Sequence, residues 1–258
     1  MRIWNGAAYF LISFFAIVAL FAPRAHADPM ALWNIVIGQC VPQFEKAVAP
    51  IPPCEHVEAA GREDRGYVDI KDRDGVAQIL TLPIRRLTGI EEPALLEPDA
   101  PNYFADAWAA RSYVEAHLRR PLPREAVAIA VNSKYARSQN QLHLHVDCVD
   151  KDVAAALAAY SSVLDLQFRL MTVELKGRRY WARRLDSSDL SGAFPFRLLA
   201  DGIDGAKGEM GLWSLAAIGA SFSGQPGFIL LADRSGPPAG GHSEDLQDHD
   251  CLITGPKS

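Results

Sequence analysis

The chain has 258 residues, of which 49% are hydrophobic and 22% are charged, so it can bury the core of one large domain or of two packed halves. Its formal net charge of −5 disfavours a nucleic-acid-binding protein, which is normally basic. An acidic chain can still bind a pyrophosphate where a few cations converge. Such clusters, each also compatible with an ordinary solvated surface, occur at Arg85-Arg86, at Lys134 with Arg137, and at Arg178-Arg179 with Arg183-Arg184.

Residues 1–27 are typical of a secretory leader. Arg2 is followed by an apolar run from Ala7 to Ala22 and then by Ala25-His26-Ala27, a small-x-small cleavage pattern. The run of 16 residues is short for a membrane span, which needs about 20. We therefore expect export to the periplasm and a mature chain that begins at Asp28, soluble or on the outer face of the inner membrane. An uncleaved N-terminal membrane anchor is the alternative.

Four cysteines in an exported chain favour two disulfides over free thiols. Cys40 and Cys54 bracket a Pro-rich connection, and a local loop of this size is easily closed by a bridge. We therefore predict the pairs Cys40–Cys54 and Cys148–Cys251. A zinc site is the alternative, although no closely spaced Cys-x-x-Cys pair supports it.

The first half of the chain predicts a helix, a hairpin and a second helix. Apolar residues at helical spacing indicate a helix over Met30–Lys46. Alternating residues predict strands at Gly66–Asp72 and Val76–Pro83, joined by a turn that contains Asp74-Gly75. Asn102 is a suitable N-cap for a helix that ends before Pro121.

Two strands follow at Ala126–Cys148, which completes the order hairpin, helix, hairpin, and Asp150 then caps a helix over Lys151–Leu164. The second half of the chain repeats the first coarsely. Three further strands are predicted at Arg178–Leu185, Gly211–Ala220 and Pro226–Asp233, followed by a Gly/Pro-rich loop at Ser235–Gly241. The order predicts an α+β fold with helices on one side of an antiparallel sheet.

The most specific feature lies in the second strand of Ala126–Cys148. Successive strand side chains point to opposite faces, so Gln141, His143 and His145 share one face and the apolar residues between them share the other. Two imidazoles two strand positions apart, roughly 6–7 Å, can act on one reacting group. One ring can serve as nucleophile while its neighbour controls orientation and protonation.

The run Gln141–Asp147 resembles the histidine-triad signature of alternating histidines and apolar residues, with the first histidine replaced by Gln141. Further segments narrow the resemblance and are similar to bacterial CDP-diacylglycerol pyrophosphatase. They are GYVDIKD at Gly66–Asp72, TLPIRRLTGIE at Thr81–Glu91, PNYFADAWAAR at Pro101–Arg111, VNSKYARSQN at Val131–Asn140 and LQDHDC at Leu246–Cys251.

This resemblance implies a histidine-triad-like antiparallel sheet in two halves, a catalytic half at 30–164 and a degenerate half with the tail at 165–258. It implies hydrolysis of CDP-diacylglycerol to CMP and phosphatidate through a nucleotide bound covalently to His143, with His145 assisting, and without a metal or cofactor. The partners expected are this lipid and the surface of the inner membrane. The residues expected around the substrate are Asn132, Lys134, Arg137, Ser138, Gln139, Asn140 and Gln141.

Two other functions fit the same residues. His143 and His145 are also suited to bind a metal in a phosphoesterase, with a third ligand from Asp147, Glu125 or His249. Alternatively, Gln141 marks a non-catalytic periplasmic protein that binds nucleotides or lipids. For His249 itself, in Asp248-His249-Asp250-Cys251, we expect a structural role.

Overall fold

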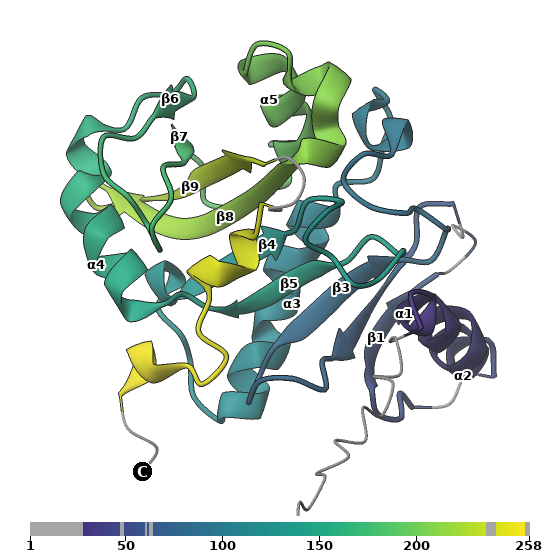
Figure 1. Ribbon diagram of the computed structural model, residues 1–258. Helices are drawn as coiled ribbons and strands as arrows, with labels where there is room; N and C mark the ends of the chain where they lie inside the picture. The colour runs from purple at the N-terminus through teal and green to yellow at the C-terminus, as the bar shows by residue number, and fades with distance from the viewer. Residues whose placement is uncertain (1–27, 47–48, 60, 62–63, 236–240, 256–258) are drawn as a thin grey trace, which may run out of the picture.

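The computed structural model describes residues 28–46, 49–59, 61, 64–235 and 241–255. The predicted leader at 1–27 and most of the predicted loop Ser235–Gly241 lie outside the described residues. In the described part of the chain, nine strands form one antiparallel sheet in the order β1-β2-β3-β5-β4-β8-β9-β7-β6 (Figure 1). The α+β class is therefore confirmed.

The strands are β1 (Cys54–Glu58), β2 (Tyr67–Lys71), β3 (Ile79–Pro83), β4 (Val127–Val131), β5 (Leu144–Cys148), β6 (Arg169–Leu170), β7 (Trp181–Leu185), β8 (Trp213–Phe222) and β9 (Gln225–Arg234). The α-helices of the described residues are α1 (Ala31–Ile35), α2 (Val41–Glu45), α3 (Tyr103–Leu118), α4 (Lys151–Tyr160) and α5 (Pro195–Gly202). A π-helical turn, η1 (Val36–Cys40), joins α1 to α2. Short 3₁₀ helices are η2 (Pro93–Leu96), η3 (Arg124–Ala126), η4 (Ser161–Val163), η5 (Ala206–Leu212), η6 (Ser243–Leu246) and η7 (Leu252–Thr254).

Local sequence signals placed several elements correctly. The predicted hairpin is β2–β3, paired antiparallel from Tyr67↔Pro83 to Lys71↔Ile79. The Asn102 side chain accepts a hydrogen bond from the backbone N–H of Ala105, so it caps α3. Asp150 caps α4 in the same way. The elements that the pattern missed are β1, β6 and α5, all short and therefore poor in periodic signal.

Helices cover both faces of the sheet, so the expectation that they lie on one side is wrong. On β4, Val127, Ile129 and Val131 belong to the core under α3. The alternate residues Ala128 and Ala130 face the opposite core, which α4 covers. Because successive strand residues point to opposite faces and both sets are apolar here, both faces must be buried.

Two four-stranded units with the same topology make up most of the sheet. The first unit is β2-β3-α3-β4-β5 with sheet order β2-β3-β5-β4, and the second unit is β6-β7-α5-β8-β9 with order β6-β7-β9-β8. They meet where β4 pairs antiparallel with β8, from Ala128↔Ile218 to Val131↔Leu215. An approximate two-fold axis therefore passes between β4 and β8, with β5 and β9 at equivalent places.

Both predicted disulfides are present. Cys40–Cys54 fastens the N-terminal helices to β1, with 5.6 Å between the Cα atoms. Cys148–Cys251 fastens the C-terminal segment to the end of β5, with 5.2 Å between the Cα atoms. None of the helices in the described residues is long and apolar enough to cross a membrane.

Candidate active site

The paired histidines lie at the start of β5, on the face of the sheet opposite α3. Leu144 and Val146 belong to the core under α3, so His143 and His145 point the other way. Their ring centroids are 4.8 Å apart and both side chains are buried. The strand begins at Leu144, so Gln141 and His143 precede it rather than lying within it as predicted.

Backbone geometry fixes the proton on His143. Its Nδ1 lies 2.7 Å from the carbonyl oxygen of Gln141, and because a carbonyl only accepts, Nδ1 carries the hydrogen. Burial, reinforced by the neighbouring His145, lowers the pKa of His143 to about 3. The ring is therefore neutral near pH 7, and its Nε2 has a free lone pair.

His145 faces an acidic partner from the C-terminal segment. Oε1 of Glu244, on η6, lies 3.2 Å from Nδ1 of His145 without the alignment of a hydrogen bond. Burial, with a contribution from the positive charge of His249, lowers the pKa of His145 to about 3. No local pattern could place Glu244 here, because about a hundred residues separate it from β5.

Asn132 holds Glu244 in place. It follows β4 directly, its Nδ2 donates to Oε2 of Glu244 over 2.8 Å, and its Oδ1 accepts from the backbone N–H of Glu244. The next residue, Ser133, forms two hydrogen bonds with Gly241. Its side-chain oxygen accepts from the backbone N–H of Gly241, and its backbone N–H donates to the carbonyl oxygen of Gly241. Asn132 therefore lies at the predicted site, with its amide directed to Glu244.

A second ion pair continues this network. Nδ1 of His249 lies 2.8 Å from Oδ2 of the buried Asp147, and its Nε2 lies 3.5 Å from Glu244. The hydrogen bond to Asp147 raises the pKa of His249, while burial raises that of Asp147. A chain of polar contacts thus runs from Asp147 through His249 and Glu244 to His145. The Cys148–Cys251 bridge draws His249 to the end of β5, and the structural role expected for His249 stays a prediction.

The loop between β4 and β5 is tied down at two points. Arg137 forms a two-pronged ion pair with Glu91, with distances of 2.7 and 2.5 Å, so its guanidinium is already paired. Gln139 accepts from the backbone of Leu32 and donates to that of Asp28. The other predicted substrate residues on this loop, Lys134, Ser138 and Asn140, are exposed.

Gln141 supports the protein rather than offering donors to a ligand. Its Nε2 donates to the carbonyl oxygens of Pro83 and Arg85, over 2.8 and 3.1 Å, at the end of β3. Its Oε1 is buried without a hydrogen-bond partner. We expected the side-chain amide of Gln141 to lie around the substrate. The part of Gln141 that contacts the histidine pair is instead its backbone carbonyl, which holds His143.

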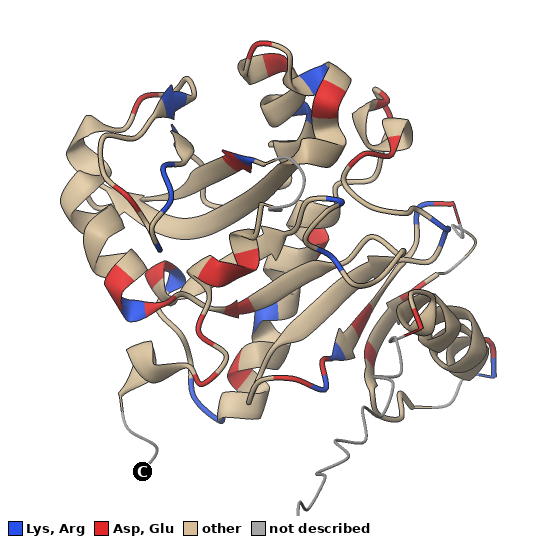
Figure 2. Ribbon diagram, viewed as in Figure 1, with Lys and Arg blue, Asp and Glu red and all other residues tan. Residues whose placement is uncertain are grey.

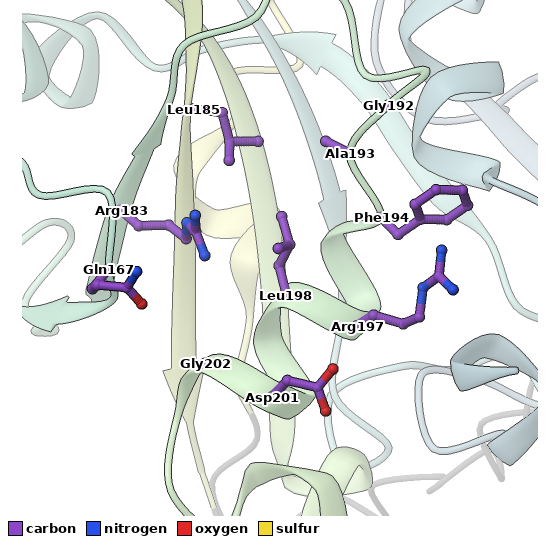
Figure 3. A pocket seen from close by; sticks show the side chains of 10 residues that line it. All are labelled: Gln167, Arg183, Leu185, Gly192, Ala193, Phe194, Arg197, Leu198, Asp201 and Gly202. Carbon is purple, nitrogen blue, oxygen red and sulfur yellow. The ribbon is translucent and has the colours of Figure 1, made fainter. Parts of the chain in front are cut away.

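Two other features of the described residues do not involve the histidine pair. The group with metal-ligand spacing is Asp147, Cys148 and Cys251, and its two sulfur atoms form a disulfide with each other. A cavity of about 460 Å³ opens in the second unit between β7 and α5, lined by residues that include Arg183, Leu198 and Asp201 (Figure 3). Its walls contain no histidine.

Comparison with known proteins gives the family. The family described as CDP-diacylglycerol pyrophosphatase matches residues 27–255. A CDP-diacylglycerol pyrophosphatase from Yersinia pestis is 39% identical over 225 residues, which cover 86% of this chain and 84% of that protein. The family match over residues 27–255 includes the N-terminal helices, the histidine pair and the C-terminal segment. The chain therefore belongs to the CDP-diacylglycerol pyrophosphatase family.

Proposed function

We propose that this CDP-diacylglycerol pyrophosphatase, an enzyme of phospholipid metabolism, works in two displacements with His143 as nucleophile. In the first, Nε2 attacks the phosphorus of the cytidylyl group, a P–N bond forms, and the P–O bond to the bridging oxygen breaks. Phosphatidate leaves with that electron pair. In the second, water attacks the same phosphorus, CMP leaves His143, and the proton of the water passes to solvent. Two easier steps thus replace one difficult displacement.

The tautomer of His143 carries this proposal. A histidine is a nucleophile only where one ring nitrogen has a free lone pair, and the bond from Nδ1 to the carbonyl of Gln141 reserves Nε2 for that role. The lowered pKa of His143 keeps the ring unprotonated well below neutral pH. The same carbonyl would stabilise the positive charge that the ring gains on attack.

His145 and Glu244 would stabilise charge on the phosphoryl group. A bound pyrophosphate favours protonated His145, since two negative phosphates offset the cost of charging a buried ring. Glu244 lies where it would receive the Nδ1–H of that imidazolium, 3.2 Å away. Nε2–H is then free to donate to a phosphoryl oxygen. Asn132 and His249 act as positioning residues for Glu244.

The exposed residues of the β4–β5 loop would meet the substrate. Lys134 supplies positive charge, and Ser138 and Asn140 supply polar groups, on a loop held by Arg137 and Gln139. Gln141 supports the loop where it enters β5.

The two sheet units support the assignment of two histidine-triad-like halves. Residues 30–164 would form the catalytic half, and residues 165–258 a degenerate half with the tail. The matching order of hairpin, helix and hairpin supports this division. The disulfides and the sequence of residues 1–27 support export to the periplasm, with the protein at the outer face of the inner membrane.

The decisive experiment traps the intermediate. The protein is mixed with CDP-diacylglycerol, quenched at alkaline pH to preserve the P–N bond, digested and examined by mass spectrometry. We expect CMP on the peptide that contains His143, with turnover unaffected by a strong chelator. CMP release without any labelled histidine, or activity that disappears with the chelator, would contradict the covalent mechanism and favour the metal-dependent alternative.

A further inference from the structure

The N-terminal helices have an unusual composition for a surface element. α1, η1 and α2 follow one another without a break from Ala31 to Glu45, and no charged residue occurs before Glu45. Figure 2 shows this helical stretch uncoloured by charge along almost its whole length, whereas α3 and α4 carry charged residues. A surface helix normally places charged or polar side chains on its outer face.

This helix is apolar where it packs on the protein, and it also exposes large apolar side chains beside the polar Asn34 and Gln39. The inner face, with Val36 and Cys40 fully buried, packs on β1–β3. The outer face exposes Ile37 at 45% and Phe44 at 40% of their surfaces. Ile51, exposed at 58%, lies next to α2 because its backbone N–H bonds Gln43. Apolar groups gathered on one exposed face mark an interaction surface.

The helix also adjoins the loop that leads to the histidines. The backbone of Leu32 donates to Gln139, and that of Asn140 donates to Pro29. On the other side, the guanidinium of Arg86 contacts the sulfur of Met30 at 3.5 Å. An object docked on the outer face of this helix would therefore lie beside the candidate active site.

We propose that the outer face of α1–α2, with Ile37, Phe44 and the partly exposed Trp33 one helical turn before Ile37, docks on a phospholipid bilayer and presents the lipid pyrophosphate to His143. The inference rests on the proposed function, since the substrate that the family name specifies is a membrane lipid. The uncharged run Ala7–Ala22 lies a few residues N-terminal to this helix and, where the leader is retained, would hold it at the membrane. Exposed Arg86 and Lys46 flank the helix and suit anionic lipid headgroups.

Trp33 provides a direct test of docking. In the full chain with Trp4→Phe, vesicles of phosphatidylcholine and phosphatidylglycerol with brominated acyl chains should quench tryptophan fluorescence. Adding Trp33→Phe should remove that quenching, because Trp108 and Trp213 are buried and the half-buried Trp181 lies on β7, toward the end of the sheet opposite β1. Equal quenching with and without Trp33, or no quenching at all, would overturn the proposal.

Kinetics separate docking from chemistry. We expect Ile37→Glu and Phe44→Glu each to raise KM for CDP-diacylglycerol in vesicles about tenfold, as expected for one lost apolar contact. Turnover of a short-chain CDP-diacylglycerol below its micelle concentration should not change. Val163→Glu, at an apolar residue 64% exposed on η4, is the matched control and should leave both activities unchanged.

The outcomes distinguish the two proposals. Unchanged vesicle kinetics, or an equal loss on both substrates, would overturn docking while leaving the histidine chemistry intact. If the wild type turned over neither substrate, the proposed function itself would fail. If the same substitutions converted a dimer to a monomer without affecting vesicles, the face would bind a second copy of the chain instead of lipid.

Discussion

The two sheet units share one topology but carry different kinds of residue at equivalent positions. On β5 the residue paired with Ala130 is His145, whereas on β9 the residue paired with Ala216 is Leu231. Both alanines belong to the same core, so the histidine and the leucine project from the same face of the sheet. The same scaffold position therefore carries a candidate catalytic histidine in one unit and a core leucine in the other.

The difference lies in what covers that face. Over β8 and β9 it is filled by apolar side chains, with α4 adding Val153 and Leu157. Over the start of β5 the cover is the C-terminal segment, which brings Glu244 and His249. A strand acquires a reactive histidine only where its covering segment supplies polar partners, because an unpaired polar group in an apolar core is costly.

The largest effect should come from the histidine of the first unit. His143→Ala should lower turnover by roughly 10⁴-fold or more, since it removes the nucleophile. The measurement is the rate of CMP release, with circular dichroism to confirm the fold. His117→Ala, at a surface residue paired with Glu55, is the control and should retain full activity. Substantial activity in His143→Ala would contradict the assignment of the nucleophile to the first unit and remove this difference between the two units.

The two disulfides should differ in their effect on the site. Replacing Cys148 and Cys251 by serine should lower the free energy of unfolding by about 2–4 kcal/mol and also reduce activity, because it frees the segment that carries Glu244. The same change at Cys40 and Cys54 should reduce stability but spare turnover of the short-chain substrate. Thermal unfolding and rates on both variants test this, and equal rates would disconnect the C-terminal segment from the chemistry.

Glu244 should matter for rate more than for stability. Glu244→Gln keeps the shape but not the charge, so turnover should fall by about 10–100-fold with little change in melting temperature. Glu209→Gln, at an exposed ion pair with Arg234 in the second unit, is the matched control and should leave turnover unchanged. An unchanged rate in Glu244→Gln would show that the charge of Glu244 does not contribute to turnover, and only the two histidines would remain as candidate catalytic groups.

Acid should destabilise the first unit. The pKa of both His143 and His145 is lowered to about 3 in the folded protein, against an ordinary value of 6.5. Both rings are buried in the neutral form, so their burial costs no proton above pH 6.5. As the pH drops from 6.5 toward 3, the unfolded chain binds more protons than the folded protein, and the free energy of unfolding falls. The His145→Gln variant should show a shallower fall when unfolding is followed by denaturant titration between pH 7 and 4. A slope equal to that of the wild type would contradict the neutral burial of His145.

Gln141 should give the smallest effect on rate. Gln141→Ala keeps the backbone carbonyl that holds His143 but removes two hydrogen bonds to Pro83 and Arg85. We expect a loss of about 1–3 kcal/mol in stability and less than about tenfold in rate. Comparing unfolding and steady-state kinetics distinguishes this from a direct contact with substrate, which would lower the rate at unchanged stability.

Several elements could be predicted from local sequence signals alone. Alternation in β2 and β3, the caps Asn102 and Asp150, and the histidine spacing on β5 are all encoded within a few residues. The cysteine pairs could also be predicted, since export favours bridges and the first pair closes a short loop. These features are fixed by backbone sterics and neighbouring side chains.

Only the tertiary structure decided which partners the histidines have. Glu244 and His249 reach β5 from about a hundred residues away, and the pairing of Arg137 with Glu91 spans 46 residues. Covering both faces of the sheet likewise depended on where α4 and α5 pack. Contacts of this range arise from chain topology and mutual burial, which no local period or cap encodes, so the site became complete only when the C-terminal segment folded over β5.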